Sequence, residues 1–112
     1  MFKEVTIGEK KVPLKATAAT LIRYRQIFGR DLLKAIGSDG NEVDAGIIQE
    51  LAYVMAMAAE GADMMKLNEE TFVAWLDEFD SFDIINPDTA MEIVDVWNAS
   101  KVTTSEAKKK DG

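Results

Sequence analysis

The sequence predicts a mainly α-helical fold of the α+β class: an N-terminal β-hairpin followed by about five helices packed around a central apolar helix. Three patterns support this prediction. Residues 2–16 alternate between apolar and polar side chains, as strands do. After residue 17, apolar side chains recur at the spacing typical of helices. Residues 45–60 are apolar on nearly every side, which predicts a buried helix.

The chain has 112 residues, of which 47% are hydrophobic, and this fits one domain with its own core. We assign residues 1–100 to a single helical domain that begins with the hairpin. Residues 101–112 are rich in charge and lack an apolar period, so we expect them to form a disordered tail.

The hairpin is predicted from two alternating segments, Phe2–Ile7 and Lys11–Ala16, with a turn at residues 8–10. Pro13 has no N–H to donate, so its strand should be an edge strand or its nitrogen should face outward. An isolated hairpin is marginally stable in water. We therefore expect it to pack against the helices that follow.

Two helices are predicted next. Thr17 is placed as the N-cap of a helix from Ala18 to Phe28, and Gly29 is placed as its end. Asp31 is placed as the N-cap of a short helix over residues 32–36. The first of these helices has an apolar stripe composed of Leu21, Tyr24, Ile27 and Phe28.

The third predicted helix starts after Asp44 and runs to about Glu60, just before Gly61. Its apolar side chains cover almost the whole circumference, although Gln49 and Glu50 lie within it. A helix of this kind, shorter than a membrane span, is expected to be the buried centre of a domain.

Two further helices complete the domain. Asn68 is the predicted N-cap of the fourth, and Asn86 followed by Pro87 marks the start of the fifth, which runs to about Asn98. The fourth helix has an apolar stripe of Phe72, Trp75, Leu76 and Phe79. The predicted stripe of the fifth is Met91, Val94 and Trp97.

The composition argues against catalysis. Histidine and cysteine are absent, which removes imidazole bases, thiolate nucleophiles and the ordinary zinc ligands. Carboxylates remain, and four of them cluster around the end of the fourth helix at Asp77, Glu78, Asp80 and Asp83. We interpret this cluster as a solvated acidic helix end. We therefore expect a protein that is not an enzyme, with no catalytic residues, no cofactor and no metal.

Charge argues against nucleic acid as a partner. The formal net charge is −7, and residues 67–100 contain nine acidic residues and no basic residue. Residues 1–36 contain eight basic and three acidic residues, a modest footprint that the rest of the chain opposes. An acidic surface of this density either is simply solvated or attracts a basic protein.

A protein partner is favoured by the aromatic and methionine side chains. A domain this small cannot hide every large apolar group, so we expect an exposed binding patch within residues 62–85. Met64 and Met65 are adaptable anchors of the kind that such patches use. Our candidate partner-binding residues are Phe72, Trp75 and Phe79.

Two segments, LKATAAT at residues 14–20 and YRQIFGRDLL at residues 24–33, resemble the N-terminal signature of a known family. That family is the tail assembly chaperones of long-tailed bacteriophages and prophages of Gram-positive bacteria. The order of the later features is similar too: an alanine- and methionine-rich helix, WLDEFD at residues 75–80, a last helix and a charged tail. The resemblance covers about residues 1–104.

The resemblance implies a non-catalytic assembly factor. Such chaperones bind the tape measure protein, keep it soluble and help to recruit tail tube subunits before leaving the finished particle. They are often made in two lengths by ribosomal frameshifting, and Lys108–Lys110 suggest an A-rich slippery site. A gene without such a site would refute that hypothesis.

The remaining expectations follow from these. No signal peptide or membrane span is predicted, because the longest apolar run, residues 51–59, has about half the length of a span. We expect the protein to act in the bacterial host cytoplasm, away from membranes, and to be absent from the mature virion. Whether the protein associates with itself stays open.

Two alternative functions also remain: a virion structural protein, such as a minor tail or head–tail connector component, and a small acidic regulatory protein that binds a basic target.

Overall fold

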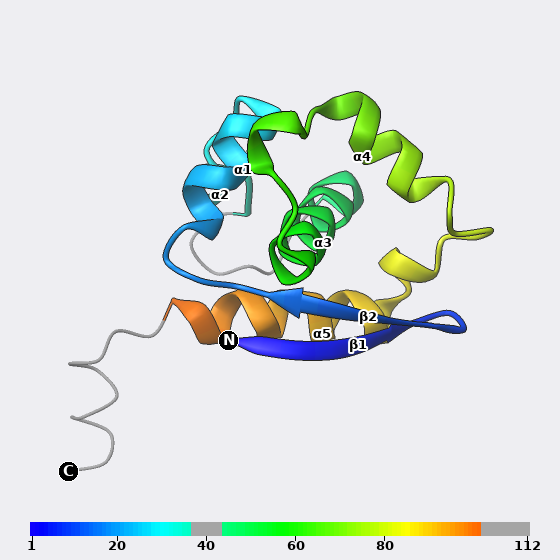
Figure 1. The fold of residues 1–112 in the computed structure, drawn as a ribbon. Coiled ribbons are helices and arrows are strands. Elements are labelled where there is room, and N and C mark those ends of the chain that lie inside the picture. Colours follow the sequence, from blue (N-terminus) through cyan, green and yellow to red (C-terminus); the bar gives the residue numbers. More distant parts are fainter. Residues whose placement is uncertain (37–43, 102–112) are drawn as a thin grey trace, which may run out of the picture.

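The computed structural model describes residues 1–36 and 44–101 and confirms the predicted α+β fold (Figure 1). A two-stranded antiparallel hairpin precedes five α-helices and two short 3-10 helices. In chain order the elements are β1 (Phe2–Ile7), β2 (Lys10–Lys15), α1 (Thr20–Phe28), α2 (Leu32–Ile36), α3 (Ala45–Glu60), η1 (Met64–Lys66), α4 (Glu69–Leu76), η2 (Asp83–Ile85) and α5 (Pro87–Ser100).

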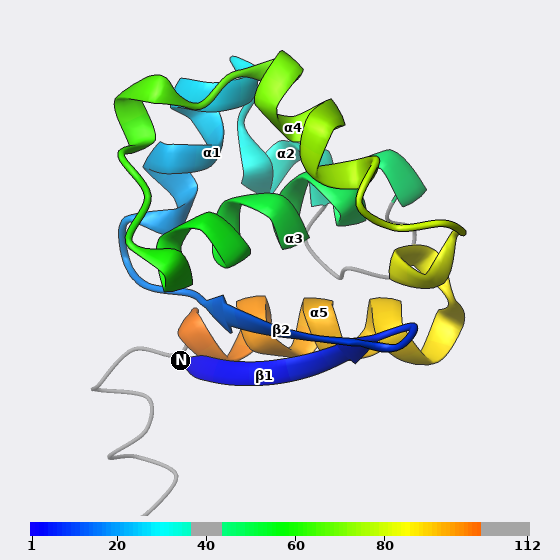
Figure 2. The same cartoon turned by 45° about the vertical axis from the view of Figure 1, so that its right-hand side comes forward.

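The elements wrap around α3. Both views show the hairpin and α5 on one side of α3, with α1, α2 and α4 on the other (Figures 1 and 2). Every residue from Glu50 to Met57 is buried, so the predicted central helix is confirmed. Its cap is confirmed as well, since the Asp44 carboxylate accepts a hydrogen bond from the Gly46 N–H at 2.7 Å.

The hairpin buries one face against α3 and α5 and exposes the other. Met1 and Ala16 exchange both backbone hydrogen bonds at 2.8 Å, which fixes the alternation of the ladder. Pro13, opposite Glu4, therefore lies in a non-hydrogen-bonded pair with its nitrogen facing outward, as expected. Strand β2 begins at Lys10, one residue earlier than predicted, because the two residues Gly8 and Glu9 are enough for the turn.

The predicted start of the first helix is wrong. Helix α1 begins at Thr20, and Thr17 does not cap it. The Thr17 hydroxyl instead accepts a hydrogen bond from the Ala19 N–H at 3.1 Å, while the Thr17 N–H donates to the Thr20 hydroxyl at 2.8 Å. These local bonds stabilise a turn before the helix. The predicted Asp31 cap of α2 is confirmed by a 2.9 Å hydrogen bond from the Leu33 N–H.

The last two long helices are positioned largely as predicted. Asn68 caps α4 in a capping box with Thr71, and Asn86 caps α5 ahead of Pro87. Helix α4 ends at Leu76, so Phe79 lies in the loop after it. The C-terminal tail predicted over residues 101–112 lies outside the described residues, apart from Lys101.

The predicted apolar stripe of α5 is wrong in one position. Met91 is 65% exposed, whereas the buried stripe consists of Ile93, Val96 and Trp97. Met91 lies about 160° around the helix from Ile93, so the two cannot share a face. The helix buries the side with its branched side chains against the hairpin and α3.

One charged side chain is buried in the core. Glu50 of α3 is 9% exposed and accepts a 2.7 Å hydrogen bond from the Tyr24 hydroxyl of α1. Arg30, just after α1, forms an ion pair with the same carboxylate. Burial, reinforced by the bond to Glu50, raises the pKa of Tyr24 to about 12. This contact joins α1 to α3 through a satisfied charge.

The membrane question has a direct structural answer. Within residues 1–36 and 44–101, no helix has both the length and the apolar character needed to cross a membrane.

We predict that alkali weakens the fold through Tyr24. Its neutral form is favoured in the folded chain, so this contribution is complete below pH 10 and is lost as the pH rises through about 12. The loss in free energy of unfolding should be about 3 kcal/mol, at about 1.36 kcal/mol for each unit of the rise in pKa. Urea denaturation of the wild type and Tyr24→Phe across this pH range measures it. A wild-type curve parallel to that of the variant would contradict the prediction.

Candidate docking surface

A continuous row of aromatic rings connects α1 to the loop after α4. The row starts at Tyr24 and Phe28 in α1, continues through Tyr53 in α3 and reaches α4 and its loop. Neighbouring ring centroids lie 5.0 to 6.4 Å apart, mostly at tilted or edge-on angles, which is the favourable geometry for aromatic pairs. The row fixes α4 against the central helix.

The structure brings the three candidate residues Phe72, Trp75 and Phe79 together in this row. Phe72 is half-buried, with its centroid 5.1 Å from that of Phe28. Trp75 is only 8% exposed and lies against Tyr53. Phe79 is half-buried and lies edge-on to Trp75 at 5.0 Å. Much of each ring therefore stabilises the fold, and only parts of Trp75 and Phe79 line surface depressions.

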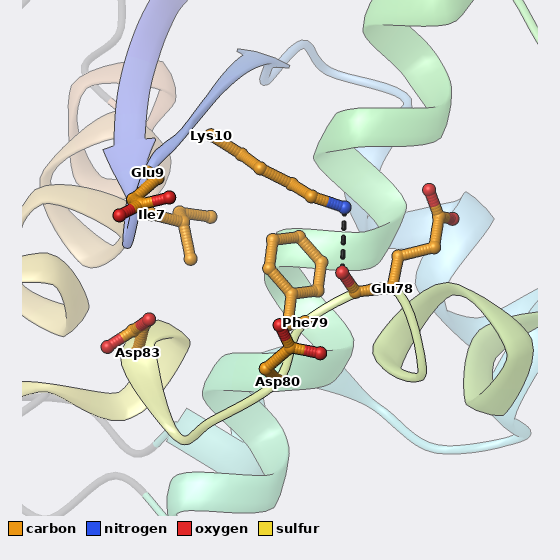
Figure 3. A pocket seen from close by; sticks show the side chains of 7 residues that line it. All are labelled: Ile7, Glu9, Lys10, Glu78, Phe79, Asp80 and Asp83. Carbon is orange, nitrogen blue, oxygen red and sulfur yellow. Dashed lines mark hydrogen bonds between the residues drawn. The ribbon is translucent and has the colours of Figure 1, made fainter.

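The first of these, the turn depression, lies between the hairpin turn and the loop after α4, with a volume of about 330 Å³ (Figure 3). Its apolar surface comes mainly from the Phe79 ring, and the buried Ile7 lies at its base. Its acidic side chains come from two distant parts of the chain, the hairpin turn and the segment from the loop after α4 to the start of η2. The lining consists of Ile7, Glu9, Lys10, Glu78, Phe79, Asp80 and Asp83.

Lys10 connects the two walls of the turn depression. Its ammonium donates a 2.7 Å hydrogen bond to the Glu78 carbonyl and lies 5.0 Å from the centroid of the Phe79 ring (Figure 3). The cation thus satisfies a carbonyl just beyond the end of α4 and gains a cation–π contact. Lys10 keeps its positive charge, but the carboxylates of Glu9, Glu78, Asp80 and Asp83 outnumber it in the lining.

Gly8 makes the close approach of the turn possible. Its φ of +63° is one that glycine adopts without strain, and a Cβ added there would lie 2.3 Å from an Asp83 carboxylate oxygen. The turn and η2 therefore touch at a position where other residues would force a shift.

The second, the helix depression, lies between α3 and α4 and has a volume of about 290 Å³. The Tyr53 and Thr71 hydroxyls share a 2.7 Å hydrogen bond beside it, and burial raises the pKa of Tyr53 above its ordinary value. The lining consists of Tyr53, Met57, Glu60, Leu67, Thr71, Ala74, Trp75 and Glu78.

Glu78 lines both depressions, and we call them together the docking face. Its side chain points away from the Phe79 ring in Figure 3, so it is the Glu78 carbonyl that borders the ring. The carboxylate instead extends toward the other side of the loop. One residue thus marks the boundary between the two depressions.

Large apolar side chains are exposed in the segment predicted to carry a binding patch. Met65 is 87% exposed, Phe82 is 76% exposed and Val73 is 52% exposed. Met64, by contrast, is half-buried against the core. The segment combines these groups with the acidic residues Asp77, Glu78 and Asp80, which are exposed.

The docking face combines an apolar lining with carboxylates. Within residues 1–36 and 44–101, no group of three acidic side chains is placed to hold a metal ion. The carboxylates at the end of α4 spread around the loop instead of converging. Apolar side chains and carboxylates thus lie side by side in its lining.

Sequence reasoning missed the residues that the hairpin and α3 contribute. Glu9, Lys10, Tyr53 and Glu60 lie far along the chain from α4 and join it only in the folded molecule. The one available signal was the pair of polar residues in the hairpin turn, which says nothing about where the turn packs.

No protein-family model, curated protein or solved structure was found to match this chain.

We predict that Gly8→Ala is destabilising in part through Asp83. The methyl group must displace the carboxylate, which should add about 1 kcal/mol to the backbone strain. Urea denaturation of Gly8→Ala, Asp83→Ala and the double variant isolates that part. The alanine at position 8 should cost less when Asp83 is absent. If Gly8→Ala lowers the free energy of unfolding equally with and without the Asp83 side chain, the close approach of the turn to Asp83 does not contribute to stability.

Proposed function

We propose that this protein is a tail assembly chaperone of a long-tailed bacteriophage or prophage, and that it acts without catalysis. It binds the tape measure protein, keeps it soluble and helps to recruit tail tube subunits during tail assembly. The resemblance of residues 14–33 to that family supports the assignment. No cofactor is needed for such a role.

One structural observation carries the binding role: apolar surface is exposed within an acidic frame. Two adjoining depressions have partly aromatic walls, and Met65, Val73 and Phe82 extend into solvent near α4. Exposed apolar groups of this size, bordered by charge, are typical of surfaces that bind other proteins. A tape measure protein is long, helical and prone to aggregate, so its chaperone must cover apolar helix surface.

The proposed site of action is the bacterial host cytoplasm, and the protein leaves before the virion is complete. Mass spectrometry of purified virions distinguishes this from a structural role in the tail or connector. A chaperone should be missing or scarce there, whereas a minor tail protein should be present in stoichiometric amounts.

The acidic rim of the docking face also favours a second candidate, a regulatory protein that binds a basic target. Such binding should weaken steeply with salt, because exposed charges are screened over about 10 Å at 0.1 M. Salt-dependent capture of a basic target, with no affinity for the tape measure protein, would support this alternative.

We predict that co-expression with the adjacent tape measure protein yields a soluble complex. Without the chaperone, that protein should be found in the insoluble fraction. Phe79→Ala should reduce the yield of complex, since its ring lines the docking face, and Phe2→Ala, which removes a ring exposed elsewhere on the hairpin, should not. Circular dichroism of both variants checks that they fold. A tape measure protein equally soluble with or without the chain would refute the proposed function.

A further inference from the structure

We infer that the docking face binds an amphipathic helix whose apolar stripe is flanked by lysine or arginine. This inference rests on the proposed function, since it specifies which part of a partner the same face recognises. It is argued from the lining of the two depressions, their charge and the secondary structure around them.

The apolar lining has room for partner side chains. In the helix depression, Met57, Leu67 and Trp75 form an apolar wall, and the exposed Ala74 leaves the entrance open. A depression of about 290 Å³ has space for one or two aliphatic side chains. In the turn depression, the Phe79 ring provides a smaller apolar surface above the buried Ile7 and beneath charged groups.

The rim selects for cations. Glu9, Asp80 and Asp83 border the turn depression, and Glu60 and Glu78 border the helix depression. Among the residues that line the two depressions, Lys10 is the one cation, and its ammonium is bound to the Glu78 carbonyl. A partner with basic side chains therefore gains attraction, while an acidic one is repelled. The stem of a lysine or arginine also suits the apolar wall beneath the rim.

The surroundings favour a helix over an extended strand as the occupant. A docking strand needs a free sheet edge with backbone groups to pair. The helix depression instead lies between α3 and α4, whose backbone groups are already paired within the helices, and it offers side chains. A helix satisfies its own backbone and presents an apolar and a basic side chain on one face, about one turn apart.

Other occupants fit less well. A metal ion needs converging carboxylates, and the described residues contain no such group. A second copy of this chain has its basic residues mainly in the hairpin and α1, with Arg30 already paired to Glu50. Of its helices that carry these cations, α1 exposes one large apolar side chain, Ile22, and α2 exposes one, Leu33, so neither presents an apolar stripe.

The test uses the full chain and two synthetic helical peptides of about 18 residues, long enough to form a helix. Both have leucine at every third or fourth position. One carries lysines beside the leucines, and its twin carries glutamates. Isothermal titration calorimetry should show binding of the lysine peptide and at least tenfold weaker binding of the twin. Equal binding of the two peptides, or a preference for the twin, overturns the inference.

Matched variants locate the binding. Glu78→Lys with Asp80→Lys should weaken binding of the lysine peptide about tenfold, and Glu4→Lys with Asp95→Lys, the same charge change on exposed residues elsewhere, should not. Ala74→Gln should block the helix depression, and Ala99→Gln on α5 is its control. Thermal melting of each variant confirms folding. If the control variants and the site variants bind the lysine peptide with equal affinity, the docking face is not the binding site.

The same variants separate this inference from the proposed function. If the site variants keep the tape measure protein soluble as well as the wild type does, the chaperone role is supported, but the docking face is not where that protein binds. If the lysine peptide binds at the docking face but no complex with the tape measure protein forms, the helix-binding inference is supported and the proposed function is refuted.

Analytical ultracentrifugation of the chain alone tests whether a second copy occupies the docking face. A dimer disrupted by Ala74→Gln would overturn the helix as its occupant.

Discussion

The structure depends on the burial of the middle of α3, from Glu50 to Met57. A helix that is apolar on all sides must be covered on all sides, and the hairpin, α1, α4 and α5 supply that cover. The one charge it carries into the core, Glu50, is satisfied by Tyr24 and Arg30. Because so much of the apolar surface serves this core, any binding surface must come from the edges of the covering elements.

The docking face is such an edge. Helix α4 turns Phe72 and Trp75 inward to cover α3, and the loop after it carries Phe79 to the hairpin turn. The acidic residues that follow have no core to enter and remain at the surface. An apolar wall with a negative rim thus results from how this short helix is packed. The proposed role as a chaperone uses that by-product of folding as a surface for a basic helix.

Local rules predicted most elements of the fold because their signals are local. Asp44, Asn68 and Asn86 cap the helices they were expected to cap, and the apolar circumference of α3 identified the centre. Thr17 was misplaced because its local hydrogen bonds form a turn before the helix, and Met91 because tertiary packing decides which face a helix buries. In the candidate site, helical spacing placed Phe72 and Trp75 on the inward side of α4, whereas Phe79 lies in the loop after that helix. The positions of Lys10, Tyr53 and Glu60 could not be predicted, since only the folded chain brings them to α4.

We propose that this protein works through contact at the docking face. Backbone amide chemical shifts of the isotope-labelled chain, recorded with and without a soluble segment of the tape measure protein, test it most directly. The shifts should be concentrated in residues that line the two depressions, with the outward face of the hairpin unchanged. Shifts confined to α1, α2 and the outward hairpin face would contradict it.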